Sequence, residues 1–153
     1  MVADPLPPDL MGVTLRPARL MDAAAFASLA TQLGYPSSPR QVEERMTTVL
    51  DDPKHLILAA VLGTSVVGWV HAYVCNLLES DAYAEIGGLV VDESYRGQGV
   101  GWKLMEGVED WARQKGCHAV SVRSSVIRHE AHKFYAGRGF ELIKTQHAFR
   151  KRL

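Results

Sequence analysis

The segment LVVDESYRGQGVG, residues 89–101, constrains the fold of this chain more than any other stretch. An apolar run rich in valine leads into a short acidic turn, and glycine then occupies every second position. The residues that follow, to about position 115, are apolar at helical spacing. The order strand, glycine-rich turn and helix places the unpaired N–H groups and partial positive charge of a helix start at the end of a strand. This arrangement is typical of an anion-binding site in an α/β protein.

Two nucleotide-binding patterns fail to match this loop. A Walker loop requires Gly-Lys-[Ser/Thr], whereas Trp102 separates Gly101 from Lys103 here. A dinucleotide fingerprint requires G-x-G-x-x-G and an acidic residue about 20 residues later, but the spacing is G-x-G-x-G and the corresponding CHAVSV segment holds no acid. A tight turn without any ligand stays open as an alternative. The positive charge of Arg96 beside the glycines favours an anion.

The rest of the chain alternates strand and helix patterns. Asp22 and Ser38 are expected to cap helices, Gly34 to end the first of them, and the GTS turn to close a hairpin. The expected elements are a strand at 13–18, helices at 22–34 and 38–52, strands at 55–62, 66–75 and 82–91, a helix from the glycine segment to about 115, a strand at 118–124, a helix at 129–137, and a two-stranded unit at 140–153. The order β-α-α-β-β-β-α-β-α-β-β predicts an α/β fold with a mixed sheet and helices on its faces.

Composition excludes several classes of protein. The length of 153 residues, with 47% hydrophobic and 22% charged residues, fits one globular domain at 13–153, preceded by a loose proline-containing arm at 1–12. A formal net charge of zero gives no global attraction to nucleic acid or to an anionic membrane, so we expect neither as a partner. The first residues lack the pattern of a signal peptide, and no apolar run approaches the roughly 20 residues of a membrane span. We expect a cytoplasmic protein with Cys75 and Cys117 reduced.

Two motifs at separate places resemble the GNAT superfamily of N-acetyltransferases. Arg96-x-x-Gly99-x-Gly101 resembles the family signature Q/R-x-x-G-x-G/A, and it lies between an apolar strand and an amphipathic helix as it does in that family. The segment EAHKFYAGRGFELIK, residues 130–144, is similar to the family's A-x-x-F-Y-x-x-x-G-F pattern. The resemblance covers nearly the whole chain from about Val13. It implies the GNAT fold, with the fourth and fifth strands splayed apart.

The resemblance also implies acetyl-CoA as cosubstrate and no metal. The pyrophosphate would lie on the backbone amides of the loop, which are those of Arg96, Gly97, Gln98, Gly99, Val100 and Gly101. The pantetheine arm would pair like an added strand with the backbone of Leu89, Val90 and Val91, and an amide there would polarise the thioester carbonyl. From the residues alone, without the family resemblance, these three positions are interpreted as part of an ordinary core strand.

An amine acceptor requires a base. At pH 7 an alkylammonium with a pKa near 10.4 loses its proton at a cost of about 4.6 kcal/mol. Glu85 is the candidate, because period-two alternation puts it on one strand face with Gly87, Leu89 and Val91, and histone-type family members carry a catalytic glutamate at the matching distance. Many small-molecule members have an acid where this chain has Gly87. The alternative for Glu85 is a solvated or salt-bridged glutamate at a sheet edge.

Tyr135 matches the tyrosine that the family uses as general acid toward the leaving thiolate. It lies four residues after Ala131 on one helix face, where the small alanine would let the cosubstrate approach. From the residues alone, Tyr135 reads as an amphipathic core anchor. Arg128 stands where the family often has an asparagine that contacts the cosubstrate, so we assign no such contact to this position.

The acceptor is expected to be a small-molecule or peptide amine, held under the helix-loop-helix segment 30–46. LGYPSS and the FRKRL ending are similar to members grouped with aminoglycoside 6′-acetyltransferases. His71 alternates with Trp69 and Tyr73 on a strand face that would line the acceptor pocket, although a lone strand histidine is more often structural. A zinc site at His129 and His132 lacks a third ligand. A homodimer is compatible with the resemblance, and a non-catalytic acyl-CoA-binding or sensing module on the same fold is the rival function.

Overall fold

The computed structural model describes residues 12–153, so most of the arm expected at 1–12 lies outside the described residues. The chain divides between Val122 and Arg123 into two compact units. The first unit holds a five-stranded sheet in the order β1-β2-β3-β4-β5, whose first four strands are antiparallel and whose last pair is parallel. No helix within residues 12–153 is both long enough and apolar enough to cross a membrane.

The elements of the first unit follow the expected order. Its strands are β1 (Val13–Pro17), β2 (His55–Leu62), β3 (Ser65–Leu77), β4 (Ser80–Val91) and β5 (Val120–Val122), and its helices are α1 (Ala23–Leu33), α2 (Pro39–Val49) and α3 (Val100–Gln114). The β3–β4 hairpin is longer than expected, because most of the predicted loop NLLESD belongs to the two strands. β5 is shorter than the predicted strand at 118–124.

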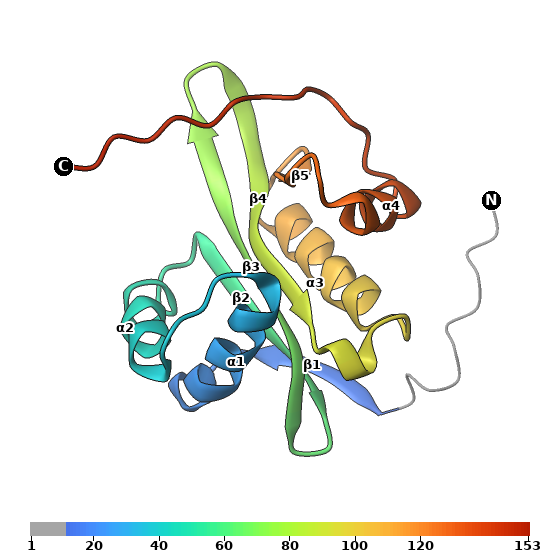
Figure 1. Ribbon diagram of the computed structural model, residues 1–153. Helices are drawn as coiled ribbons and strands as arrows, with labels where there is room; N and C mark the ends of the chain where they lie inside the picture. The colour runs from blue at the N-terminus through green and yellow to red at the C-terminus, as the bar shows by residue number, and fades with distance from the viewer. Residues whose placement is uncertain (1–11) are drawn as a thin grey trace. The chain divides into compact units, whose positions relative to one another are not determined.

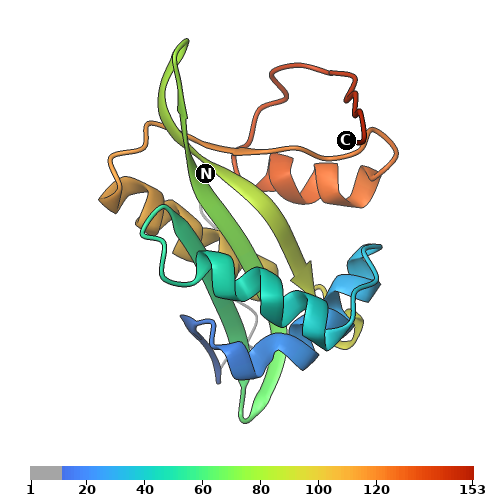
Figure 2. The ribbon, with the colours of Figure 1, turned by 90° about the vertical axis from the view of Figure 1, so that its left-hand side faces the viewer.

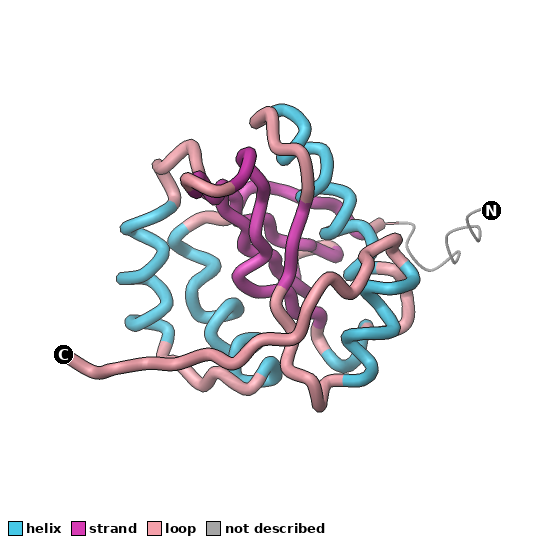
Figure 3. The backbone as a smooth tube through the Cα atoms, turned by 90° about the horizontal axis from the view of Figure 1, so that it is seen from above, coloured by secondary structure: helices cyan, strands magenta, loops and turns pink. Residues whose placement is uncertain are grey.

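Helices cover both faces of the sheet. Figure 1 shows α1 and α2 on one side of the strands and α3 on the other, and Figure 3 shows the same layering from above. On the α1/α2 face, which Figure 2 turns toward the reader, Phe26, Met46 and Ala59 form a buried cluster against which Trp69 packs. On the α3 face, Leu104, Met105 and Val108 are buried. Both apolar faces are therefore withdrawn from water, as a mixed sheet requires.

The helix caps confirm one prediction and correct another. Ser38 caps α2, since its Oγ accepts from the Gln41 amide at 3.1 Å and Pro39 occupies the first turn. Asp22 precedes α1, but its side chain caps no amide of that helix. Its carboxylate instead accepts two hydrogen bonds of 2.7 Å from Arg16, and one of 2.8 Å from the Arg19 amide. The prediction was wrong because a guanidinium from β1 lies within reach and binds the carboxylate at both oxygens.

The register of the sheet shifts at three points, and two of these shifts are bulges that bear on the site. In β3, Val66 pairs with Val61 and Gly68 with Ala60, so Val67 is the extra residue. In β4, Ile86 pairs with Ala72 and Gly88 with His71, which makes Gly87 the extra residue. Each bulge reverses the face on which the following side chains lie.

The second unit, from Arg123 to Leu153, contains α4 (His129–Gly137) and an irregular tail. The two strands predicted at 140–153 do not form. FELIKTQHAFRKRL contains no glycine, proline, asparagine or aspartate to fix a hairpin turn, and an isolated two-stranded hairpin is marginally stable at best. Leu142 and Phe149 are accordingly exposed, at 89% and 94%.

Candidate active site

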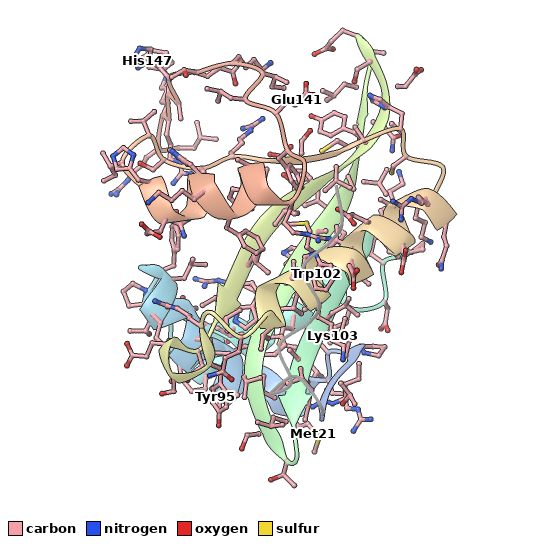
Figure 4. All side chains as sticks on the ribbon, turned by 90° about the vertical axis from the view of Figure 1, so that its right-hand side faces the viewer. Met21, Tyr95, Trp102, Lys103, Glu141 and His147 are labelled. Atoms are coloured by element: carbon pink, nitrogen blue, oxygen red, sulfur yellow. The ribbon has the colours of Figure 1, made fainter. Side chains whose placement is uncertain are left out.

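The glycine loop between β4 and α3 has the backbone of an anion site. A 3₁₀ turn, η3 (Glu93–Tyr95), follows β4, and Gly97 and Gly99 then adopt left-handed φ angles of 75° and 84°. Gly99 is the N-cap of α3 and makes no side-chain cap. Figure 4 shows Tyr95 before the helix and Trp102 and Lys103 near its start. The first amides of α3 therefore lack a side-chain cap at the position where a phosphate binds best.

Side-chain hydrogen bonds fix the entry to this loop. Asp92 Oδ1 accepts from the Ser94 amide at 2.8 Å, which closes the turn and lowers the pKa of the Asp92 carboxyl. Gln32, at the end of α1, donates to Asp92 Oδ2 at 3.3 Å and accepts from the Glu93 amide at 3.0 Å. Sequence reasoning missed Gln32, because nothing local to a helix end predicts a contact about sixty residues away.

Arg96 is anchored to its own strand. Its Nε donates to Val91 O at 3.0 Å, and the side chain is otherwise exposed. The hydrogen bond uses one donor of the guanidinium, which leaves the two terminal nitrogens for an anion beside the loop. The same bond gives the Val91 carbonyl a hydrogen-bond donor.

One edge of β4 has no strand partner after Ile86 within residues 12–153. Pairing with β5 covers only Ala84 to Ile86 in the sheet. Asp92 N donates to Val67 O of β3 at 2.8 Å, so alternation directs the amide and carbonyl of Val90 to β3 as well. Those of Leu89 and Val91 point to the opposite edge. Of the three residues predicted to bind the pantetheine arm, Val90 therefore has no backbone group directed to that edge.

Glu85 lies on a different face from the one expected. It pairs with Tyr73 of β3, whereas Leu89 pairs with Val70, and the bulge at Gly87 separates the two positions. Glu85 therefore lies on the α1/α2 face with Tyr73, and Leu89 and Val91 lie on the α3 face. The Glu85 side chain is only 5% exposed, which excludes the reading as a solvated edge residue.

His71 is part of a cluster rather than a lone strand histidine. His55 of β2 stacks against it with ring centroids 5.2 Å apart, and His55 Nδ1 and His71 Nε2 are joined by a hydrogen bond of 2.9 Å. Tyr73 contacts both rings. Burial, with a smaller effect from His55, lowers the pKa of His71 to about 4, so His71 is neutral at pH 7. Trp69, by contrast, stacks on Phe26 in the core.

Tyr135 lies in the second unit, on α4. Its ring packs edge-on against Phe134 and Phe140, with centroids 5.4 and 5.6 Å away. Burial raises the pKa of its hydroxyl, so the group holds its proton at neutral pH, as a general acid must. On the same helix, His132 Nε2 is hydrogen-bonded to Ser125 O at 2.8 Å. Within residues 12–153, no three His, Cys, Asp or Glu side chains gather in a way that could hold a metal ion.

Comparison with known proteins establishes the family. A model of the "Acetyltransferase (GNAT) family" matches residues 23–140. This chain belongs to the GNAT family. The match spans both motifs identified above, from α1 to the phenylalanine that follows α4.

Relatives and solved structures agree with this assignment. The chain is 32% identical over 133 residues to an aminoglycoside N(6′)-acetyltransferase type 1 of Stenotrophomonas maltophilia, covering 84% of this chain and 86% of that protein. Its fold matches AAC(6′)-Iy in complex with a bisubstrate analogue, with a TM-score of 0.81, 21% identity, and coverage of 92% of this chain and 99% of that one. It also matches a transcriptional regulator from Bacillus halodurans C-125, with a TM-score of 0.82, 22% identity, and coverage of 91% and 99%. The two structural likenesses show the fold alone.

Proposed function

We propose that this protein transfers the acetyl group of acetyl-CoA to a primary amine by direct attack in a ternary complex, and that residues 13–153 act as one catalytic domain. The observation that carries the proposal is the continuity of a strand edge that β5 leaves uncovered, a loop with two left-handed glycines, and an α3 start without a side-chain cap. Together they offer hydrogen-bond donors for a pantetheine amide chain and then for a pyrophosphate. A GNAT protein uses such a surface for acetyl-CoA.

The loop holds the cosubstrate through backbone groups. The amides of residues 96–101 and the partial positive charge of α3 receive the pyrophosphate, with Arg96 beside them. Leu89 offers both its amide and its carbonyl to the pantetheine arm. Val91 offers its amide, because Arg96 already occupies its carbonyl. Because these donors belong to a strand and a helix, they are in place before the thioester arrives.

Glu85 and Tyr135 carry the proton chemistry of the proposal. Glu85 takes a proton from the acceptor ammonium, and the amine then attacks the thioester carbonyl. As the C–N bond forms and the C–S bond breaks, Tyr135 gives its hydroxyl proton to the leaving sulfur. The second proton leaving the nitrogen then restores the Tyr135 hydroxyl, so that only the proton on Glu85 remains to be released. Glu85 is buried and Tyr135 has a raised pKa, and both features fit groups that exchange protons out of contact with bulk water.

The acceptor class follows from the relatives. The 32% identical protein is an aminoglycoside N(6′)-acetyltransferase, which supports a small amine-bearing molecule as the acceptor. The test is release of CoA thiol from acetyl-CoA over a panel of neamine, spermidine, an aminoalkylphosphonate and a lysine peptide. Turnover with at least one amine is expected. Stoichiometric acetyl-CoA binding without thiol release on any amine would instead support the acyl-CoA-binding or sensing module.

Two variants test the assigned roles. Tyr135→Phe should lower kcat by about 10²-fold or more and leave acetyl-CoA affinity within twofold, because it removes only a proton donor. Glu85→Gln should lower kcat most at neutral pH and recover as pH approaches the pKa of the amine, where the acceptor loses its proton unaided. A kcat unchanged by either substitution removes that residue from the mechanism.

A further inference from the structure

Acetyl transfer to an ammonium releases one proton, and the buried site has to deliver it to water. The balance is R–NH₃⁺ plus acetyl-CoA giving the amide, CoA thiol and H⁺. Of the two protons that leave the nitrogen, one ends on the thiol sulfur and the other must reach solvent. Glu85 is 5% exposed, so its carboxyl has little direct contact with bulk water. The inference below rests on the proposed function.

The histidine pair beside Glu85 leads from the interior to the surface. Glu85 pairs across the sheet with Tyr73, and His71 lies two residues along on the same face. Such diagonal neighbours lie about 7–8 Å apart, a span that two long side chains and a water cover. His71 is hydrogen-bonded to His55, whose side chain is 24% exposed and whose Nε2 lies 4.0 Å from Asp52 Oδ2.

One hydrogen bond and the charge of a nearby carboxylate favour one arrangement of protons on the two rings. A neutral imidazole carries one N–H, and the negative charge of Asp52, 4.0 Å from His55 Nε2, favours that proton on Nε2. His55 Nδ1 is then an acceptor, so His71 Nε2 must donate to it. The lone pair of His71 is left on Nδ1.

Gly87 leaves that lone pair accessible. A Cβ added to Gly87 would lie 3.6 Å from His71 Nδ1 and 3.5 Å from Tyr73 Cε1. The bulge at Gly87 is also where the edge of β4 that β5 leaves uncovered begins. A side chain at this position would cover Nδ1, and the sequence has none there.

We propose that His71 and His55 form a relay that carries the released proton from the acceptor site to solvent. A proton passes from Glu85, through a site water, to His71 Nδ1. The His71 Nε2 proton moves to His55 Nδ1, and the His55 Nε2 proton leaves to water beside Asp52. Each ring gains one proton and loses one, so each ring ends neutral with its proton on Nδ1. Proton exchange with water then returns both rings to the tautomer protonated on Nε2. His71 accepts the proton that the reaction releases, and His55 contributes only by accepting a proton from His71.

The electrostatics of the cluster suit a neutral relay. The ionisable side chains placed around the pair are Asp52 before β2, Tyr73 on β3 and Glu85 on β4. Burial holds the pKa of His71 near 4, well below neutral pH, so His71 does not become trapped as a cation while the proton passes.

Kinetics with neamine as the acceptor test the relay. His71→Gln and His55→Gln should each lower kcat at pH 7 about 10- to 100-fold, with the KM for acetyl-CoA within twofold of the wild type. In His55→Ala, kcat should rise in proportion to added imidazole, because free imidazole replaces the lost proton carrier, whereas the wild type should not respond. His118→Gln removes an exposed histidine outside the cluster and should keep kcat within twofold. Reactions with imidazole but no amine correct for acetylation of the buffer.

Two kinetic results overturn the relay. One is a wild-type kcat in both glutamine variants, and the other is a loss in His55→Ala that imidazole does not restore. Long-range ¹H–¹⁵N NMR of the wild type gives a readout independent of turnover, with the His71 ring expected to be neutral and protonated on Nε2 at pH 7. A His71 proton on Nδ1 also overturns the relay. Absence of thiol release by the wild type on every amine would instead overturn the proposed function, and the relay with it.

Discussion

At the scale of single residues, the three loop glycines serve different ends. Gly97 and Gly99 hold φ angles of 75° and 84°, where a residue with a Cβ is strained. Gly101 lies inside α3 and has no positive φ, so its own backbone does not require glycine. Its small size is useful only if a ligand comes close to the helix start, as the proposed pyrophosphate would.

Alanine substitutions should separate these two causes. Gly97→Ala should destabilise the protein by about 1–2 kcal/mol through backbone strain alone, because no atom lies within 4 Å of its added Cβ. Gly101→Ala should leave stability equal or raise it by about 0.5–1 kcal/mol and should keep acetyl-CoA affinity within about threefold, because the family signature has glycine or alanine at this position. Gly101→Val, which adds more bulk, should weaken acetyl-CoA binding about tenfold. Urea unfolding and calorimetric titration measure the two effects. Unchanged acetyl-CoA affinity in Gly101→Val would argue against a phosphate at this helix start.

Asp22 shows how one carboxylate joins β1 to α1. It is 5% exposed and bonded to Arg16, which holds the pKa of its carboxyl below the usual value of 3.8. Asp22→Asn should therefore lower the free energy of unfolding by about 2 kcal/mol at pH 7, somewhat less than for a fully buried pair, since Arg16 stays partly exposed. The exposed pair of Asp110 and Arg113 is the control, and Asp110→Asn should cost less than about 0.5 kcal/mol.

The same pair predicts a pH dependence. A carboxyl whose folded-state pKa is depressed contributes its full stabilisation above its unfolded pKa, and the contribution is lost as pH falls through the folded pKa. The difference in unfolding free energy between wild type and Asp22→Asn should thus be constant above about pH 5 and shrink below about pH 4. Urea titrations at several pH values measure it. A difference that persists undiminished at pH 2 would contradict the ion pair as its source.

At the scale of elements, α1 is connected to the glycine loop through Gln32. This side chain bonds both Asp92 and the Glu93 amide, so the end of α1 also holds the entry of the glycine loop. A helix end and a loop that are distant in sequence act as one structural piece.

Removing this connection should weaken cosubstrate binding more than stability. Gln32→Ala deletes two hydrogen bonds, each worth about 0.5–1.5 kcal/mol, and should raise the Kd for acetyl-CoA about 3- to 10-fold. Thr31→Ala is the matched control, because that hydroxyl bonds only the Ala27 carbonyl of its own helix, and it should leave Kd within twofold. Calorimetric titration of both variants checks the prediction. An equal loss of affinity in the two would mean that the effect comes from α1 itself.

At the scale of the whole molecule, stability is unevenly distributed between the two units. β3 and β4 of the first unit contain fully buried residues, including Val70, Ala72 and Ala84. α4 contains no buried residue, and residues 140–153 form no strand. Elements with few buried apolar contacts open locally at low free energy.

Hydrogen exchange and ligand binding should report this difference. Amides of β3 and β4 should exchange only by global unfolding, amides of α4 should exchange markedly faster, and those of 140–153 fastest.

Acetyl-CoA at about 100 times its Kd should stabilise the protein by about 2.7 kcal/mol, seen as a higher Tm, while ATP and NAD should give no shift. An equal Tm shift with ATP would contradict specificity of the loop for CoA.

Much of this architecture was predictable from the sequence. The strand–glycine–helix segment, the Ser38 cap and the GTS turn depend on short-range spacing and backbone preference, which a sequence displays directly. The two family motifs likewise identified the GNAT fold. The prediction of two strands at 140–153 was wrong, because alternation of apolar and polar residues does not by itself supply a turn or a neighbouring strand edge.

Only the tertiary structure decided which side chains share a face. An unbroken β2–β3 hairpin would pair His71 with Leu56 and put His55 on the opposite face, but the extra residue Val67 shifts the register and brings the two histidines together. The bulge at Gly87 likewise places Glu85 beside them and away from Leu89. A bulge is one residue long and is stabilised by packing between distant elements, whereas the loop and its helix are encoded locally. The sequence therefore determined where acetyl-CoA is expected to bind, and the folded sheet determined which ionisable side chains share a face with Glu85.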